Sequence, residues 1–208
     1  MAAIDSIVAG AAGRFEVRNG ARDRALIDSR QIIRHAATAI RALHRGEYEV
    51  AGRDLERGRD MVRATKGELQ DHPDLYWAGY VQDAQKEFAE ANIVAAMVQG
   101  HDIPGPDDLG VEDAPYLNGL AEAASEMRRY VLDIIRKSGG REMGEAERVL
   151  HLMDDVYTNL ITVDYPDSIT GGLRRTTDAL RAVLERTRGD LTISIRQWEL
   201  ERALRERS

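Results

Sequence analysis

Acidic residues recur at helical spacing in the middle of the chain, and they are the side chains best suited to chemistry. Asp83, Glu87 and Glu90 stand at i, i+4 and i+7, so they share one stripe of a helix whose other positions are mostly apolar. Grouping carboxylates in an apolar setting is unfavourable unless a cation or an arginine offsets their charge. The stripe therefore indicates either a divalent-metal site or ion pairs with a neighbouring helix.

A second acidic face lies on the helix predicted over residues 115–137. Glu122, Glu126, Arg129 and Asp133 share one side of that helix, opposite an apolar face. Taken alone, this pattern is typical of a helix surface in contact with water.

The remaining residue types exclude most catalytic templates. The chain has no cysteine, which excludes a disulfide scaffold, a zinc ribbon and a thiol nucleophile. It contains no GxxxxGKS/T or GxGxxG loop, no HExxH motif and no serine elbow, and no histidine follows a glutamate at the spacing of ferritin-like di-iron sites. Clustered carboxylates without histidine or cysteine suit the hard ions Mg²⁺ or Mn²⁺.

Arginine carries almost all of the positive charge, since only three of the 29 basic residues are lysines. The planar guanidinium of arginine binds phosphate oxygens through two hydrogen bonds, which the ammonium of lysine cannot match. The helix predicted over residues 21–46 carries an arginine stripe opposite its apolar face, made of Arg30, Arg34, Arg41 and Arg45. This stripe indicates either a solvated face or a track for a phosphate backbone. Arg129, Arg174 and Arg175 are later candidates for nucleic-acid binding. The net charge of −7 argues only against a uniformly basic nucleic-acid binder.

Long helices must position these residues. The chain has 208 residues, five prolines and few aromatics, so we predict an all-α fold of about seven helices in a single domain over residues 1–208. Helix-breaking residues, mainly glycine and proline, divide the chain at these positions: Gly20, Gly46, 72–73, 100–115, Gly139–Gly140 and 165–172. We expect residues 1–20 to form a separate N-terminal segment and residues 100–115 to form a surface loop. The central helix is predicted over 74–99, with Trp77 in its apolar arc.

No part of the sequence indicates a membrane protein. Apolar runs fall well short of the roughly 20 residues that a bilayer span needs, and the first residues lack the features of a signal peptide. We therefore expect a soluble, cytoplasmic protein with no membrane partner.

The two acidic stretches resemble the signature stretches of the translin family. Residues 86–91 read KEFAEA and residues 116–129 read YLNGLAEAASEMRR. They are most similar to the catalytic branch of that family, translin-associated factor X, in which the first stretch reads Glu-Phe-Ile-Glu-Ala and the second begins Tyr-Leu-x-Gly-Val-Ala-Asp. Residues 29–46, SRQIIRHAATAIRALHRG, also look like archaeal members of the family.

This resemblance implies a metal-dependent endoribonuclease that binds single-stranded RNA or DNA and assembles into a closed homo-oligomer such as an octamer. Carried over residue by residue, it implies that Glu87, Glu90 and Glu122 are the catalytic carboxylates and hold Mg²⁺ or Mn²⁺. Glu126 would be an auxiliary ligand or a partner for Arg129. The resemblance also implies that the second acidic face meets the first across a helix pair. One departure is Glu122, which stands where the catalytic branch has aspartate and is longer by one methylene.

Two other functions remain open at this point. The first is a non-catalytic scaffold for single-stranded nucleic acid that resembles translin proper, which lacks the paired glutamates. The second is a helical nucleotide pyrophosphohydrolase, which also uses Glu-x-x-Glu carboxylates. The second is disfavoured because such enzymes need a later Glu-x-x-Asp, and the residues three positions after Glu122 and Glu126 are Ser125 and Arg129.

Overall fold

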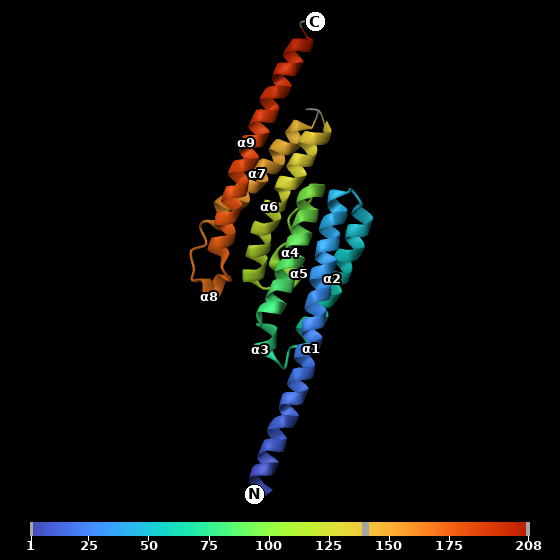
Figure 1. Ribbon diagram of the computed structural model, residues 1–208, viewed down its shortest axis with the longest axis vertical. Helices are drawn as coiled ribbons and strands as arrows, with labels where there is room; N and C mark the ends of the chain where they lie inside the picture. The colour runs from blue at the N-terminus through green and yellow to red at the C-terminus, as the bar shows by residue number, and fades with distance from the viewer. Residues whose placement is uncertain (1, 139–141, 207–208) are drawn as a thin grey trace.

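The computed structural model describes residues 2–138 and 142–206, and within them the secondary structure consists of helices without strands (Figure 1). The described elements are α1 (Ala2–His44), α2 (Tyr48–Glu68), α3 (Pro73–Tyr76), α4 (Gly79–Gln99), α5 (Pro106–Leu109), α6 (Asp113–Ser138), α7 (Met143–Leu160), α8 (Asp167–Thr170) and α9 (Leu173–Arg205). The all-α prediction is confirmed. Six of these helices are long and three have four residues each, compared with the seven or so expected.

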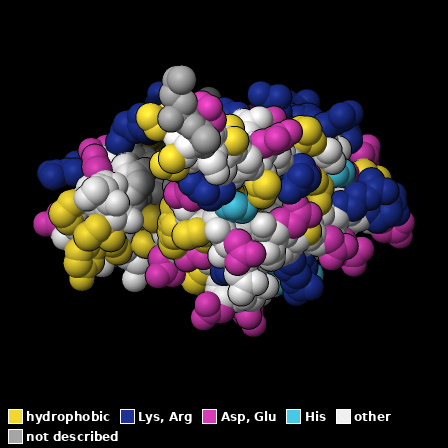
Figure 2. Space-filling model, turned by 90° about the horizontal axis from the view of Figure 1, so that it is seen from below, with side chains coloured by type: hydrophobic (Ala, Val, Ile, Leu, Met, Phe, Trp, Pro, Cys, Tyr) yellow, Lys and Arg dark blue, Asp and Glu magenta, His cyan; other side chains and the backbone are white. Residues whose placement is uncertain are grey.

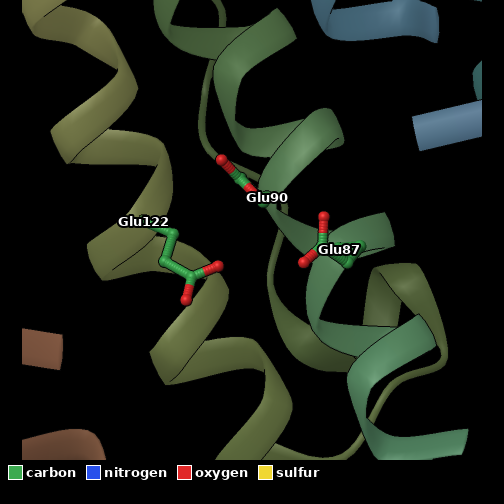
Figure 3. Close-up of side chains that lie close together, drawn as sticks. All are labelled: Glu87, Glu90 and Glu122. Carbon is green, nitrogen blue, oxygen red and sulfur yellow. The ribbon is translucent and has the colours of Figure 1, made fainter. Parts of the chain in front are cut away.

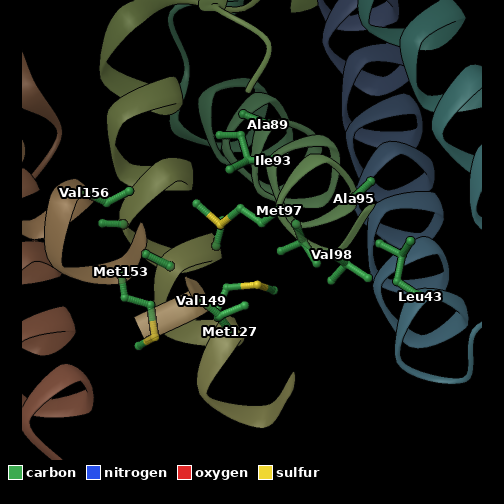
Figure 4. Close-up of a cluster of buried hydrophobic side chains, with 14 of the residues drawn as sticks. Leu43, Ala89, Ile93, Ala95, Met97, Val98, Met127, Val149, Met153 and Val156 are labelled. Atoms are coloured by element: carbon green, nitrogen blue, oxygen red, sulfur yellow. The ribbon is translucent and has the colours of Figure 1, made fainter. Parts of the chain in front are cut away.

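The long helices form a bundle with α4 in the middle. Helix α4 packs against α1 on one side and α6 on the other, while α2 lies against α1, and α7 and α9 lie beyond α6 (Figure 1). A hydrophobic cluster joins these helices, with Met97, Met127 and Met153 meeting from α4, α6 and α7 (Figure 4). Because α4 is enclosed by neighbours, the stripe of acidic residues that it carries is partly shielded from water.

Helix α1 runs without interruption through Gly20, so the predicted break there is wrong. A glycine inside a helix costs only about 1 kcal/mol relative to alanine, and the many helix-forming residues around it tolerate that cost. The first half of α1 projects beyond the bundle, as the last turns of α9 do at the opposite end (Figure 1). The described part of the expected separate segment, residues 2–20, therefore belongs to α1.

Other predicted breaks coincide with helix ends. Gly46 and Gly100 both adopt positive φ, +76° and +68°, two residues after the end of α1 and directly after α4. The segment over residues 100–115 is not simply a surface loop, because it contains α5, and Leu109 is only 2% exposed. The break expected at Gly139–Gly140 lies outside the described residues.

The helix predicted over 74–99 is split in two. Helix α3 ends at Tyr76 and α4 begins at Gly79, which leaves Trp77 in the connection. Its side chain is 59% exposed instead of belonging to the apolar arc. Among the described helices, none is long and apolar enough to cross a membrane.

Candidate metal centre

Three glutamates meet between α4 and α6. Glu87 and Glu90 lie one turn apart on α4, Glu122 faces them from α6, and one carboxylate oxygen of each lies within 4.8 Å of the others (Figure 3). All three side chains are half-buried. The structure thus brings together the three residues that the resemblance implied, whereas Asp83, one turn earlier on the same stripe, is exposed and lies outside the cluster.

Gly119 is the residue that lets the two helices approach at this point. A Cβ atom built on Gly119 would lie 2.7 Å from the carbonyl oxygen of Lys86 and 3.1 Å from the backbone nitrogen of Glu90. These distances are too short for any side chain, so only glycine allows this contact. Because Glu122 follows Gly119 by one turn of α6, the close contact sets the separation between Glu122 and the two glutamates of α4.

The charges in this cluster repel one another. Burial is the largest cause that raises the pKa of Glu90, from 4.5 to about 8, and the negative charges of Glu87, Glu122 and Glu126 raise it further. The ammonium of Lys86 acts in the opposite direction. Glu90 therefore holds a proton at neutral pH, and additional positive charge at the centre would favour its ionised form.

Lys86 lies inside the cluster, and sequence reasoning did not identify it. Its Nζ lies 2.9 Å from Oε2 of Glu122 and 3.2 Å from Oε1 of Glu87. Burial alone would lower the pKa of Lys86, but hydrogen bonds and the charges of Glu122 and Glu87 raise it above its usual value. The only signal in the sequence is that one of the three lysines directly precedes Glu87.

Glu126 has a different partner from those predicted. Its Oε1 lies 2.6 Å from Nε2 of His44, at the end of α1, and the His44 side chain is almost completely buried. Glu126 is outside the three-carboxylate cluster, although its charge acts on Glu90. Arg129 is exposed, and no ion pair joins it to Glu126 among the described residues.

The donor set fits a divalent ion. Carboxylate oxygens are the ligands that Mg²⁺ and Mn²⁺ prefer. Two ligand atoms on opposite sides of Mg²⁺ are about 4.2 Å apart, which is twice the usual bond length. The oxygens of Glu87, Glu90 and Glu122 lie within 4.8 Å of one another, so a small inward movement of the side chains would bring them into range.

The arginine stripe of α1 does not reach this centre within one protomer. Its four members are exposed, and none contacts the three glutamates in the part of the chain that the structure describes. Arg45 binds Glu47 through two hydrogen bonds, of 2.6 and 2.8 Å, and Arg41 donates to Thr38. Arg30 and Arg34 have no side-chain partner among the described residues.

A surface hollow of about 410 Å³ adjoins the carboxylates and shares Lys86 and Glu122 with them. We call it the side hollow, and its other walls include Trp77, Ile169 and Arg175. Arg175 is thus the predicted nucleic-acid-binding arginine that lies beside the centre, whereas Arg174 lines a different hollow.

Comparisons with known proteins agree with this architecture. No family model matches the sequence. The chain is 29% identical over 190 residues to the uncharacterized protein MJ0175 of Methanocaldococcus jannaschii, a match that covers 90% of this chain and 82% of that protein. It also matches a solved structure of AfC3PO in complex with duplex RNA, with a TM-score of 0.81 and 28% identity over 90% of this chain and 95% of that one.

A solved structure of apo-NeC3PO shares the fold at a TM-score of 0.80 and 17% identity, over 90% of this chain and 96% of that one. The chain therefore has the all-helical fold of the C3PO proteins, and its sequence is similar to that of AfC3PO.

Proposed function

We propose that this chain binds RNA and hydrolyses its phosphodiester bonds at the centre formed by Glu87, Glu90 and Glu122, with Mg²⁺ or Mn²⁺ as the cofactor. The observation that carries the proposal is the meeting of three carboxylates within 4.8 Å, one of which has a pKa raised to about 8. Such a group of mutually repelling acids in a half-buried site is typical of functional centres.

Each residue has a role in this proposal. Glu87, Glu90 and Glu122 would each supply one carboxylate oxygen to the ion, and Glu90 would release its proton as the positive charge enters. A bound divalent ion would supply electrostatic activation of the phosphate and of an attacking water. Lys86, released from Glu87 and Glu122, would present its ammonium to a phosphate oxygen at the edge of the side hollow.

The match with AfC3PO in complex with duplex RNA supports RNA as the ligand. It adds duplex RNA to the single-stranded RNA or DNA that the sequence resemblance implied. Arg175 lines the side hollow together with Glu122, and Arg30 and Arg34 are exposed and without side-chain partners among the described residues. These three arginines are therefore available to a phosphate backbone.

We also propose that the chain forms a homo-oligomer. The projecting half of α1 exposes Ile4, Val8 and Phe15 at coiled-coil spacing, and the projecting end of α9 exposes Leu200. Apolar stripes on helices without neighbours are typical of surfaces that a partner covers. Light scattering coupled to size-exclusion chromatography should give a mass several times 23.2 kDa, and a stable monomer would contradict this proposal.

A specific observation favours a second candidate function, a non-catalytic RNA-binding scaffold. Lys86 forms ion pairs with Glu87 and Glu122, so a cation of the protein itself already offsets part of their charge without a metal ion. This scaffold would show salt-sensitive binding of RNA without divalent-dependent turnover.

Isosteric variants separate the two functions. We expect purified protein with Mn²⁺ to cleave labelled RNA, and the double variant Glu87→Gln/Glu90→Gln to remain folded and bind RNA without cleaving it. Asp133→Asn, on the same helix as Glu122 but paired with Arg136, is the matched control and should cleave at the wild-type rate. Equal cleavage by the wild type and the double variant would refute the assignment, and RNA binding without any cleavage would favour the scaffold.

A further inference from the structure

The side hollow has an exposed aromatic wall that the proposed chemistry does not use. Trp77 is 59% exposed in the connection between α3 and α4, and Ile169 of α8, on another wall of the same hollow, is 64% exposed. Figure 2 shows a group of hydrophobic side chains at the surface on the side of the molecule where α8 lies in Figure 1. Two large apolar side chains from separate elements thus line one open hollow.

Trp77 contacts its neighbour in the sequence. The ring of Tyr76 meets the indole at right angles, with centroids 5.4 Å apart, and the Tyr76 hydroxyl donates to Oε1 of Glu112 at 2.5 Å. The backbone N–H of Trp77 donates to the carbonyl of Pro73. The indole therefore contacts Tyr76 and is still 59% exposed, so a ligand in the hollow could stack on it.

Hydrogen bonds hold the opposite wall. Asn118 of α6 donates to the carbonyl of Thr170 at 2.8 Å and accepts a hydrogen bond from Thr176 at 2.7 Å. These bonds tie the turn between α8 and α9 to α6, and Gly171 and Gly172 give that turn its shape because both adopt positive φ. The side hollow therefore lies between the exposed indole and a turn held by hydrogen bonds.

Two cations and two carboxylates line the hollow: Arg175 and Lys86 are available to a phosphate, and Asp83 and Glu122 carry negative charge. Among the described residues, the guanidinium of Arg175 has no hydrogen-bond or ion-pair partner. Lys86 and Glu122 belong to both the hollow and the carboxylate centre, so a ligand in the hollow lies directly beside the centre. The volume, about 410 Å³, is near the lower end of the range of small-molecule sites, about 300 to 1,000 Å³, so it suits one nucleotide and not a duplex.

We propose that the side hollow holds one unpaired nucleotide of the RNA, with its base stacked on Trp77 and its phosphate bound by Arg175 beside the carboxylate centre. This inference rests on the proposed function for the identity of the ligand. It also narrows the substrate class, because a base can stack on Trp77 only when it is unpaired or flipped out of a duplex. Stacking and a phosphate contact accept any base. The subsite therefore discriminates between unpaired and paired nucleotides and does not discriminate between base sequences.

Intrinsic fluorescence tests the stacking directly. The chain has two tryptophans, so Trp198→Phe leaves Trp77 as the single emitter, and Trp77→Phe leaves Trp198 as the matched control. Both are made in the Glu87→Gln/Glu90→Gln background, in which RNA stays intact, and titrated with a ten-nucleotide single-stranded RNA and with a blunt duplex of the same sequence. Binding is followed in parallel by the anisotropy of labelled RNA.

We expect the single strand to quench Trp77 emission with the same midpoint as the anisotropy, the duplex to quench it much less, and Trp198 emission to change little. Trp77→Ala should weaken single-strand binding about tenfold, as the loss of one stacked base does. Arg175→Gln should lower the salt dependence of binding by about one phosphate contact. Arg181 is an exposed arginine farther along α9 and outside the hollow, so Arg181→Gln should leave the salt dependence of binding unchanged.

Two results would overturn the inference. The first is unchanged Trp77 emission when anisotropy shows saturated binding. The second is a Trp77→Ala variant that dissociates the oligomer while its RNA affinity per protomer stays the same, which would assign this wall to a contact between copies of the chain. Neither result depends on turnover, so a failure of the proposed cleavage activity would be distinguished from a failure of this subsite.

Discussion

Replacing Gly119 by alanine should disable the carboxylate centre without touching any carboxylate. The added Cβ would lie 2.7 Å from the Lys86 carbonyl oxygen, whereas an ordinary contact begins at 3.4 Å, so α6 must retreat from α4 by about 0.7 Å. Side chains that bind a metal ion generally tolerate a displacement of about 0.5 Å. The retreat carries Glu122 away from Glu87 and Glu90, and we expect cleavage to fall by about 100-fold, the effect typical of a 1 Å misplacement.

The stability of this variant should change much less than its activity. Overpacking costs about 1 to 3 kcal/mol, and the better helix propensity of alanine returns about 1 kcal/mol of that. Thermal unfolding measures this change, and calorimetric titration with Mn²⁺ together with RNA cleavage measures the functional loss.

Gly58 provides the matched control because its added Cβ would also be crowded, but against the Phe88 ring where α4 meets α2 and not where α4 meets α6. That Cβ would lie 3.0 Å from the Phe88 ring between α2 and α4. Gly58→Ala should therefore lose a similar amount of stability and keep Mn²⁺ affinity and activity. The reasoning fails if Gly119→Ala is folded and binds Mn²⁺ as tightly as the wild type.

Three further substitutions test the charges at the carboxylate centre and the side-chain length at position 122. The pKa of Glu90 is raised from 4.5 to about 8, so between these values the folded protein binds a proton that the unfolded chain releases, and stability without divalent ions should fall as pH rises through this window. One titrating group changes the free energy of unfolding by at most about 1.4 kcal/mol per pH unit. Glu90→Gln should reduce this pH dependence, which urea titrations at pH 5 and pH 8 measure. Lys86→Met removes the cation between Glu87 and Glu122, so scanning fluorimetry should show a lower Tm without metal and a larger rise with Mn²⁺ than in the wild type. Glu122→Asp draws the carboxylate back by roughly 1.5 Å and should weaken Mn²⁺ binding, although aspartate is the residue of the family that the sequence resembles.

Each of these expectations has a contradicting outcome. A pH slope that survives in Glu90→Gln would mean that another group titrates. An equal Mn²⁺-induced rise in Tm for Lys86→Met and the wild type would mean that the ion does not replace the ammonium. Tighter Mn²⁺ binding by Glu122→Asp would show that the longer side chain is a defect and not an adaptation of this chain.

The pair of glutamates on α4 was predictable from the sequence, because local spacing is enough to place residues on one face of a helix. Glu87 and Glu90 lie three positions apart, so any helix aligns them, and the position of Glu122 followed from a resemblance in a second stretch. The spacing also included Asp83, which lies one turn before Glu87 on α4 but is exposed and outside the cluster.

Tertiary contacts explain what sequence reasoning missed. Glu126 is bound by His44, which is 82 positions away along the chain, and no local pattern encodes that distance. Lys86 reaches Glu122 on another helix, a contact that depends on the packing of α4 against α6 at Gly119. Trp77 was placed in the apolar arc by helical period, but the chain leaves the helix at that residue and exposes the ring.

Crystals grown with Mn²⁺ and measured for anomalous scattering test the central claim most directly. We predict one peak between α4 and α6, about 2.2 Å from oxygens of Glu87, Glu90 and Glu122, with Nζ of Lys86 displaced from its position between Glu87 and Glu122. A map without this peak, with Lys86 still bound to Glu122 at a Mn²⁺ concentration that supports RNA cleavage, would contradict the assignment of these glutamates as the metal centre.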